Sequence, residues 1–461
     1  MTPAQHKHDR PIAALLVPDI LALLEEAPGD LAAETEEMHA ADLANVVEAM
    51  PPERVGEFLR ALPPNRAAQV IEYLDDELRA EFLEHVTTEQ AAEIISEMTP
   101  DDRADVLETL EEKTAGDILS DLPDQARQET EKLLQFEPDT AGGLMTTGFV
   151  AVEQALGVEE ALAQVRAAAR SGRREAMHAI YVVDPDEKLV GVMSLRELLA
   201  APEGAKVADV MHTEIVSVQA SADREEVARV TSEYDLVAVP VVDGFGRIVG
   251  AITVDDVIDA IVEEQTEDVQ RLGAVQPLDD PYFVASFWDV ARRRIVWLVV
   301  LFIGAIFTST AMQGYMTTVG QAAWLTVFVP LIISSGGNSG SQSSTLIIRA
   351  LAVGDVEIAD ALRIFLRELG QGIALGACLA IIGFVLVMVG TDHAARFGVV
   401  VALSVVLVVV VGTVVGSMLP LLLHRIGFDP AVASSPFVAS IVDVTGIVVY
   451  FTVARQLLGL A

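Results

Sequence analysis

The sequence predicts a multidomain membrane protein with an N-terminal all-α superhelical domain, tandem α/β domains, a connecting helix and a five-helix α transmembrane domain. Three observations predict this architecture: a 12-residue repeat from His39, an internal duplication between residues 178 and 254, and long apolar segments after residue 295. Only 8 of the 68 acidic and 9 of the 30 basic residues lie beyond Pro281, so residues 1–280 carry a net charge of −39. The chain therefore changes from an acidic soluble part to apolar helices near residue 285.

The repeat consists of seven consecutive units that begin at His39. Most units open with Pro, Asp or Thr, which suit the start of a helix, and positions 8, 9 and 12 of each unit are apolar. Each unit therefore predicts one short amphipathic helix, and the stacked units predict a superhelical solenoid with a largely solvated acidic face. The units read HAADLANVVEAM, PPERVGEFLRAL, PPNRAAQVIEYL, DDELRAEFLEHV, TTEQAAEIISEM, TPDDRADVLETL and EEKTAGDILSDL.

The segment QFEPDTAGG, residues 135–143, ends the array because its proline and glycines disfavour further helix. We therefore expect six parts: a helical lead-in, the repeat domain, two α/β domains, a connecting helix and the transmembrane domain. Their predicted boundaries are residues 1–38, 39–136, 137–204, 205–264, 265–290 and 291–461.

The duplicated segments are residues 178–196, HAIYVVDPDEKLVGVMSLR, and residues 236–254, LVAVPVVDGFGRIVGAITV. Each reads as an apolar strand, an Asp-led turn, a second strand and a helix start. Each copy resembles a cystathionine β-synthase (CBS) domain, and such domains occur in pairs. The resemblance implies an adenine-nucleotide site made by a Ser or Thr and an Asp three residues later. The second copy has Thr253 and Asp256, whereas the first has Ser194 and Glu197 in place of the Ser/Thr–Asp pair. ATP is therefore a candidate ligand, with half of the nucleotide signature present. A metal-binding role is the alternative for Asp256.

Residues 255–268 read DDVIDAIVEEQTED and follow the second copy directly. On a helix, Asp256, Asp259, Glu263 and Glu267 would share one face, where like charges repel. Two such charges about 4 Å apart repel by roughly 4 kcal/mol at an effective dielectric near 20. Hard divalent ions that bridge two acidic surfaces would therefore act as a conformational clamp, and a merely solvated face is the alternative interpretation.

Five apolar spans are predicted after residue 290. No charged residue lies between Arg294 and Arg349, a run long enough for two membrane helices of about 20 residues each. Three further spans cover about residues 369–391, 398–423 and 431–454. No apolar stretch follows Met1, so we expect no cleavable secretory signal.

Basic residues beside the spans predict the orientation in the cell membrane, plasma or inner, because they accumulate on the cytoplasmic side. On one side of the membrane, the basic residues beside the predicted spans are only Arg396 and Arg455. We therefore expect a cytoplasmic N-terminus and, after five spans, a C-terminus outside. The other side carries Arg292, Arg293, Arg294, Arg349, Arg363, Arg367 and Arg425.

The second span is expected to line a pore. Its proline and its run GGNSGSQ interrupt an otherwise apolar helix, and broken backbone at membrane depth is tolerated where it lines a wet cavity. Close helix packing through small residues is the alternative interpretation. The candidate pore-lining residues of this span are Pro330, Gly336, Gly337, Asn338, Gly340 and Gln342.

The fifth span contains Asp443, the one carboxylate expected deep inside the membrane part. Pro436 is expected to free an upstream carbonyl and to line the pore, and the carbonyl of Ala439 would face the same side as Asp443. A carboxylate with carbonyls and water suits Mg²⁺, which keeps several of its own waters. Because no basic residue lies within the core of any span, Asp443 is expected to mark an ion path.

The order of these motifs resembles the MgtE family of magnesium channels over essentially the whole chain. The motifs that carry the resemblance are EPDTAGGLMT, TEDVQRLGAV, PLIISSGGNSGSQ and GSMLPLLLHRIGFDPAVASSPFVASIVDVTG, together with the array and the CBS pair. The resemblance implies a homodimer, a pore lined by the second and fifth spans, Mg²⁺ held at Asp443, and cytoplasmic domains that close the pore when Mg²⁺ is abundant. It also implies regulatory metal positions at Glu225, Asp235, Asp256, Asp259, Glu264, Glu267, Asp268 and, from the array, Asp101.

The function expected is therefore Mg²⁺ uptake through a selective channel, with the bilayer as surroundings and Mg²⁺ as substrate and regulator. The nearest alternative is a proton- or sodium-coupled transporter of Mg²⁺ or Co²⁺ that uses Asp443. No enzyme is expected, because an intramembrane metalloprotease needs HExxH within a span and the histidines beyond residue 281 are His393 and His424. No nucleic-acid partner is expected either.

Overall fold

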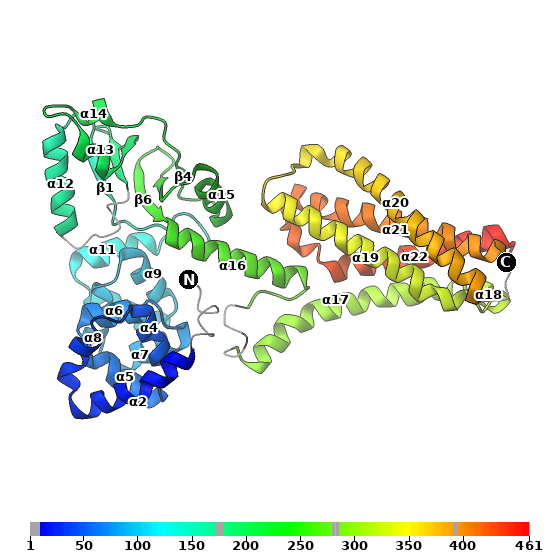
Figure 1. Ribbon diagram of the computed structural model, residues 1–461, viewed down its shortest axis with the longest axis horizontal. Helices are drawn as coiled ribbons and strands as arrows, with labels where there is room; N and C mark the ends of the chain where they lie inside the picture. The colour runs from blue at the N-terminus through cyan, green and yellow to red at the C-terminus, as the bar shows by residue number, and fades with distance from the viewer. Residues whose placement is uncertain (1–9, 171–178, 279–281, 283–284, 391–394, 461) are drawn as a thin grey trace. The chain divides into compact units, whose positions relative to one another are not determined.

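The computed structural model describes residues 10–170, 179–278, 282, 285–390 and 395–460 (Figure 1). The chain divides into two compact units, residues 1–263 and 264–461. The first unit holds the helical array and the two α/β domains, and the second holds the long apolar helices.

The array forms one helix from each repeat, as predicted. Side chains at the first position of several units cap their helices: Asp75, Thr87 and Thr99 accept hydrogen bonds from backbone N–H groups. Alternate helices stack, with α4 on α6, α6 on α8 and α8 on α10, so the apolar positions form one continuous core. The helices are α2 (Arg10–Glu26), α3 (Leu31–Glu34), α4 (Ala40–Glu48), α5 (Pro52–Ala61), α6 (Pro64–Ile71), α7 (Asp76–His85), α8 (Thr88–Ser96), α9 (Pro100–Glu108), α10 (Glu112–Asp121) and α11 (Asp124–Leu133).

Two sheets of the same topology follow, which confirms the duplication for the described residues; residue 178 lies outside them. In each sheet the first strand pairs parallel with the second, and the second pairs antiparallel with the third. Equivalent pairs, Ile180 with Met193 and Val239 with Ile252, set the register of the two hairpins. The elements are β1 (Val150–Glu153), α12 (Val158–Arg170), β2 (Ile180–Val183), β3 (Leu189–Met193), α13 (Leu195–Ala200), α14 (Val207–Val210), β4 (Val218–Gln219), α15 (Arg224–Tyr234), β5 (Ala238–Val242) and β6 (Ile248–Thr253).

The connecting segment differs from the expected helix over residues 265–290. Helix α16 (Val254–Leu272) continues from β6, ends at Leu272 and is followed by a turn in which Ala274 has a φ of 56°. Pro277 then disfavours further helix, and α17 starts at Phe287. The side chain of Arg293 donates to the carbonyl of Pro277, which ties the turn to α17.

Among the residues that the structure describes, five long helices follow residue 285, as predicted. Four of them are long and apolar enough to cross a membrane. The remaining one, α19, has 28 residues, but its glycines and polar residues lower its hydropathy. The helices are α17 (Phe287–Gln313), α19 (Leu325–Ala352), α20 (Ala361–Gly390), α21 (Ala395–Arg425) and α22 (Ser435–Leu458), with the short α18 (Met316–Gln321) before α19.

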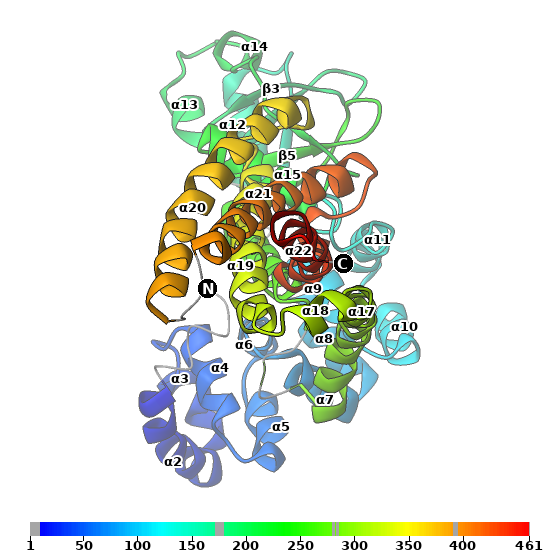
Figure 2. The same cartoon turned by 90° about the vertical axis from the view of Figure 1, so that its right-hand side faces the viewer.

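Helix α19 is continuous, so the interruption expected at its proline and its GGNSGSQ run is not found. Two of its glycines lie against α21, where added Cβ atoms on Gly412 and Gly416 would collide with the carbonyl oxygens of Gly336 and Gly340. Figures 1 and 2 show these two helices side by side. The small residues therefore bring two backbones into contact, which is the packing alternative.

Candidate ion pathway and acidic cluster

The loop before α22 positions its first turn. Ser344 on α19 donates to the carbonyl of Ala433 at 2.9 Å, and Ser341 donates to the carbonyl of Ser435 at 3.2 Å. Pro436 lies in the first turn of α22, where no intrahelical N–H is needed. The expectation that Pro436 frees an upstream carbonyl within a span is therefore wrong, because the helix begins at this point.

Asp443 lies on α22 eight residues after the helix begins, which corresponds to about 12 Å along the axis. Its side chain is partly exposed and forms no ion pair or hydrogen bond with the residues that the structure describes. Ala439 lies one turn earlier, and a Cβ on Gly337 of α19 would be 3.6 Å from the Cβ of Ala439. An unpartnered carboxylate therefore lies one turn after a contact between α19 and α22.

The predicted pore-lining residues of α19 occupy two sides of the helix. Asn338 and Gln342 are exposed and lie one turn apart, and Pro330 is also exposed. Gly336 and Gly340 are buried against α21, so these two glycines serve packing. Gly337 borders α22 and lies between the two sets.

Asp443 is not alone among the carboxylates of the long helices. Glu368 is only 6% exposed. It lies within α20, because this helix begins at Ala361, before the span expected from residue 369. The Ser343 hydroxyl on α19 donates to Glu368 Oε2 at 2.7 Å. The apolar pattern alone did not indicate this residue, which stands beside Arg367 in the sequence.

A second group of carboxylates lies where the array meets the second α/β domain. We call Asp101, Asp102, Asp255 and Asp256 the acidic cluster. Asp101 is 7% exposed, and its Oδ1 has no hydrogen-bond partner in the described part of the chain. Thr99 donates to Asp102 Oδ2 at 2.6 Å, and Thr253 donates to Asp256 Oδ2 at 2.5 Å.

The acidic cluster is electrostatically unfavourable when all of its members are ionised. Burial, reinforced by the charge of Asp101, raises the pKa of Asp256 to about 8. Burial and Asp101 likewise raise the pKa of Asp102 to about 6, and burial raises the pKa of Asp101 itself. Burial and like charges therefore favour the protonated forms of Asp101, Asp102 and Asp256 in this cluster.

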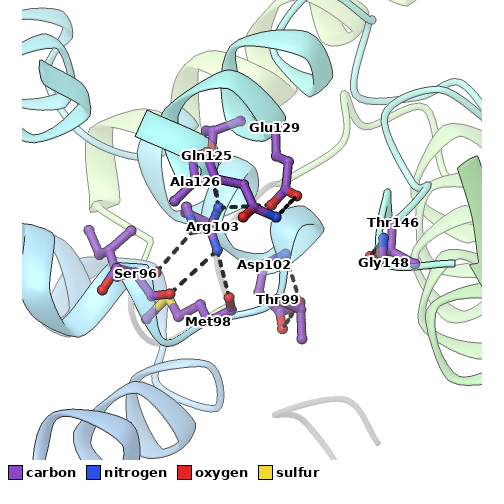
Figure 3. A network of polar contacts seen from close by, with 12 residues as sticks. Ser96, Met98, Thr99, Asp102, Arg103, Gln125, Ala126, Glu129, Thr146 and Gly148 are labelled. Carbon is purple, nitrogen blue, oxygen red and sulfur yellow. Dashed lines mark hydrogen bonds and ion pairs between the residues drawn. The ribbon is translucent and has the colours of Figure 1, made fainter. Parts of the chain in front are cut away.

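Arg103 holds the start of α9, which carries Asp101 and Asp102, and Figure 3 shows Arg103 with Asp102 close by. Its buried guanidinium donates to the carbonyls of Ile95, Met98 and Ala126 at 3.2, 3.0 and 3.1 Å. These bonds satisfy carbonyls at the end of α8 and within α11, so α8, α9 and α11 are fixed to one another. The positions of the two aspartates on α9 are fixed as a result.

Arginines meet two of the four acids expected to repel on one face of α16. Arg224 donates to Glu263 at 3.1 Å, and Arg271 donates to Glu267 at 2.5 Å. Arginines from neighbouring turns therefore offset part of the repulsion predicted on this face, and bridging by divalent ions stays a prediction. Asp256 and Asp259 lie nearer the start of the helix, and the hydrogen-bond and ion-pair contacts just described do not involve them.

The last turns of α16 approach the loop before α22. Burial, followed by the charges of Asp429 and Glu264, raises the pKa of Asp268. Arg271 Nη1 donates to Asp429 Oδ2 at 2.7 Å. Asp429 was not among the predicted residues, because its loop position gave no spacing relative to α16.

The remaining predicted metal residues lie apart from one another. Glu225 is exposed in the first turn of α15, whereas Asp235 caps the other end of that helix with a φ of 51°. Among the described residues, no three acidic, His or Cys side chains converge in a geometry that could hold a metal ion. The carboxylates are therefore gathered in regions rather than in one preformed metal site.

A small pocket lies between the two α/β domains, with Thr253 in its wall. The hydroxyl of Tyr181, which also lines it, is buried and has no hydrogen-bond partner among the described residues. In the first domain, Glu197 accepts from Ser194 at 2.9 Å and contacts His212 at 2.8 Å, so its carboxylate is already engaged. The pocket is lined by Thr146, Phe149, Ala179, Tyr181, Ala238, Ala251 and Thr253.

Three family descriptions match the chain in the predicted order. The MgtE intracellular N domain matches residues 38–139, the CBS domain matches residues 141–204 and 207–263, and the MgtE divalent cation transporter domain matches residues 329–453. Magnesium transporter MgtE of Thermus thermophilus is 44% identical over 335 residues, which cover 72% of this chain and 73% of that protein. The chain belongs to the MgtE family.

Other MgtE proteins support the same relationship. Magnesium transporter MgtE of Enterococcus faecalis is 33% identical over 332 residues, with 71% of each chain covered. The crystal structure of the cytosolic domain of the Mg²⁺ channel MgtE in complex with ATP is 38% identical, covers 53% of this chain and 99% of that one, and has a TM-score of 0.50. The soluble part of a magnesium transporter is 28% identical, covers 55% and 99%, and has a TM-score of 0.51. The predicted family and fold class are confirmed.

Proposed function

We propose that this MgtE protein is a Mg²⁺-selective channel for magnesium uptake, closed by Mg²⁺ that binds its acidic cytosolic part. The observation that carries this proposal is Asp443, a carboxylate in a membrane helix with no partner among the described residues. An ionised group at this depth is costly and is retained mainly where it serves an ion path. The relatives named as magnesium transporters support Mg²⁺ as the ion.

The ion pathway runs between α19 and α22 in this proposal. The Asp443 carboxylate supplies the fixed negative charge that replaces part of the ion's hydration. The carbonyl of Ala439 has a lone pair beyond its helical hydrogen bond, and it can accept a hydrogen bond from an ion-bound water. Mg²⁺ gives up its waters reluctantly, so a partly hydrated ion suits this sparse set of oxygens. The exposed amides of Asn338 and Gln342 extend the polar path along α19.

Mg²⁺ regulates the channel through the acidic cluster. The unpartnered Oδ1 of Asp101 and the raised pKa of Asp256 both support a cation between α9 and the start of α16. Mg²⁺ there would neutralise the repulsion and stabilise the compact cytosolic part over an opened one. Asp259 extends this acidic surface, and Glu225 and Asp235 remain proposed metal ligands from the family resemblance.

A second regulatory site is proposed at the end of α16. Glu264, Glu267 and Asp268 gather near Asp429, in the turn that precedes α22. A Mg²⁺ ion bound by these carboxylates would join α16 to the helix that carries Asp443. Binding at this point would therefore alter the ion pathway directly.

ATP is proposed as a second ligand, in the pocket between the α/β domains. The buried Tyr181 hydroxyl and the Thr253 hydroxyl are polar groups in an otherwise apolar wall. A solved cytosolic domain of an MgtE channel contains ATP. Because Thr253 bonds to Asp256, nucleotide and metal would compete for the same carboxylate.

We propose a homodimer in the cell membrane, with the N-terminus in the cytoplasm. Helix α17 has no buried residue in the described chain, although it is strongly apolar, so lipid or a second copy can cover it. The arginines at the start of α17 and α20 and at the end of α21 favour this orientation.

Ion flux into proteoliposomes tests the proposed function. The protein should carry Mg²⁺ down its gradient without a proton or sodium gradient, and Asp443→Asn should abolish the flux. Asp355→Asn, an exposed loop carboxylate, is the matched control and should leave the flux unchanged. Flux that requires a proton or sodium gradient would instead favour the coupled transporter, and normal flux in Asp443→Asn would contradict the pathway.

A further inference from the structure

Glu368 is a buried carboxyl that the proposed ion pathway does not use. It lies seven residues inside α20, about 10 Å from the helix start, and is 6% exposed. No basic side chain among the described residues forms an ion pair with it, although Arg363 and Arg367 lie nearby in the sequence. A carboxyl group this deep is costly unless hydrogen bonds satisfy it.

The bonds of Glu368 join three helices. The Ser343 hydroxyl of α19, itself 6% exposed, donates to Glu368 Oε2 at 2.7 Å. The Thr413 hydroxyl of α21 lies 3.2 Å from the Glu368 carbonyl oxygen and 3.1 Å from that of Val410. Gly372 lies one turn further along α20. A Cβ added there would collide with Thr413 Oγ1, so there is no room for a side chain. The side chains of Ser343, Glu368 and Thr413 are therefore buried and closely packed.

Ser343 occupies a defined side of α19. It lies four residues after Ser339 and three after Gly340, on the buried side that contacts α21, whereas Asn338 and Gln342 are exposed. The glycine contacts determine how closely α19 approaches α21. They are contacts between backbone atoms, and glycine has no side chain that could form a hydrogen bond. Ser343 with Glu368 supplies the directional contact that glycines cannot supply.

We propose that Glu368 is a positioning residue for the ion pathway: through Ser343 it fixes the rotation of α19, and hence which side chains of α19 face the ions. This inference rests on the proposed pathway between α19 and α22. Glu368 itself touches no ion. Its carboxyl oxygen acts as a buried acceptor, so a side chain of the same length with an acceptor oxygen should replace it.

Conductance of the full-length protein in planar bilayers tests the acceptor role. Glu368→Leu removes the acceptor, and Ser343→Ala removes the donor with little change in volume. Each should lower Mg²⁺ conductance per folded protein about tenfold, the loss expected for one buried hydrogen bond to a carboxyl group. Glu368→Gln should stay within about twofold of the parent. Gln371→Leu, on the exposed side of α20, is the matched control.

A second readout separates positioning from stability. Cys378 is the chain's single cysteine, so Cys378→Ala provides a cysteine-free background. The reaction rate of Gln342→Cys with a hydrophilic thiol reagent then reports the rotation of α19. This rate should change in Glu368→Leu and remain at the parental value in Glu368→Gln. A loss of stability alone would reduce the amount of folded protein and leave the rate per folded molecule unaltered.

Three results would overturn the positioning role: parental conductance in both Glu368→Leu and Ser343→Ala, an unaltered thiol rate in Glu368→Leu, or a Glu368→Gln variant as defective as Glu368→Leu. Asp443→Asn tested in parallel distinguishes the two proposals. Normal conduction by Asp443→Asn would overturn the ion pathway and the inference with it. Lost conduction there, with normal conduction in Glu368→Leu, would overturn the positioning role alone.

Discussion

Arg271 on the last turn of α16 donates to Asp429 Oδ2 at 2.7 Å, and Asp429 lies in the turn from which α22 begins. The same guanidinium bonds to Glu267 at 2.5 Å. One arginine therefore joins α16 to the loop that precedes α22, the helix that carries Asp443. This contact lies within the second compact unit, between the end of α16 and the loop before α22.

Arg271→Leu should weaken closure by Mg²⁺. The substitution removes the contact between α16 and the loop before α22, so Mg²⁺ bound at the end of α16 is less firmly connected to α22. A partly exposed charged pair of this kind contributes about 1 kcal/mol, so the Mg²⁺ concentration for half closure should rise about fivefold. Single-channel recording at stepped Mg²⁺ measures the shift. Arg229→Leu removes an exposed pair on α15 and should leave half closure unaltered; an equal shift in both variants would show that charge alone is responsible.

Neutralising the acids of α16 should leave the channel open. In the combined variant Asp259→Asn, Glu264→Gln, Glu267→Gln and Asp268→Asn, both bridging and repulsion are lost. We expect constitutive opening at millimolar Mg²⁺, because a bridging ion also fixes geometry, whereas the loss of repulsion adds no contact that holds the closed form. Protection of the cytosolic part from protease by millimolar Mg²⁺ should disappear in the same variant. Closure at the parental Mg²⁺ concentration would show that these acids form only a solvated face.

The acidic cluster predicts a pH dependence with a definite sign. The pKa of Asp256 is raised to about 8 and that of Asp102 to about 6, from an ordinary value of 3.8. Raised values mean that the packed cluster is stabilised in its protonated form. The stabilisation is complete below about pH 4 and is lost as the pH rises through 6 and then 8. Without Mg²⁺, the melting temperature of the cytosolic part should therefore fall between about pH 6 and 8.5.

Millimolar Mg²⁺ should restore that melting temperature at the higher pH, because a bound cation replaces the protons. Asp256→Asn should flatten the pH dependence, whereas Asp117→Asn, an exposed acid on α10, should preserve it. A melting temperature that does not vary with pH in the Mg²⁺-free parent would rule out a packed cluster of this kind.

Gly412→Ala should destabilise the membrane part. Its Cβ would collide with the carbonyl oxygen of Gly336, and backbone atoms cannot move aside as a side chain can. Overpacking of this kind costs about 1–3 kcal/mol, which thermal unfolding in detergent would detect. Gly337→Ala is the matched control, because its Cβ meets only Ala439, at an ordinary 3.6 Å. Equal melting temperatures for the two variants would refute the close contact of α19 and α21.

The fold could be predicted from the sequence in the regions where a sequence pattern repeats. The 12-residue period gave one helix per unit, and the duplicated hairpins gave two equal sheets, because each depends on local caps and alternating apolar residues. The end of α16 at Leu272 and the continuity of α19 were not predicted. Both depend on tertiary contacts: a turn held by Arg293, and glycines that face a neighbouring backbone.

The candidate site residues could likewise be predicted only where a local sequence pattern marks them. Asp443 was recognisable because no basic residue lies in the spans around it. Asp102 and Asp429 join the acidic groups only through the packing of segments far apart in sequence. Glu368 was missed because its sequence neighbourhood resembles a charged loop, whereas the helix it occupies starts earlier and buries it. Sequence spacing cannot reveal such partners.

Current through single proteins in membrane patches tests the central claim most directly. Cytoplasmic Mg²⁺ is stepped from zero to millimolar while Mg²⁺ on the other side carries inward current. The account predicts discrete Mg²⁺ currents at zero cytoplasmic Mg²⁺ that vanish on its addition, and none in Asp443→Asn. Mg²⁺ uptake without discrete currents and dependent on a proton or sodium gradient, or currents that persist at millimolar cytoplasmic Mg²⁺, would contradict it.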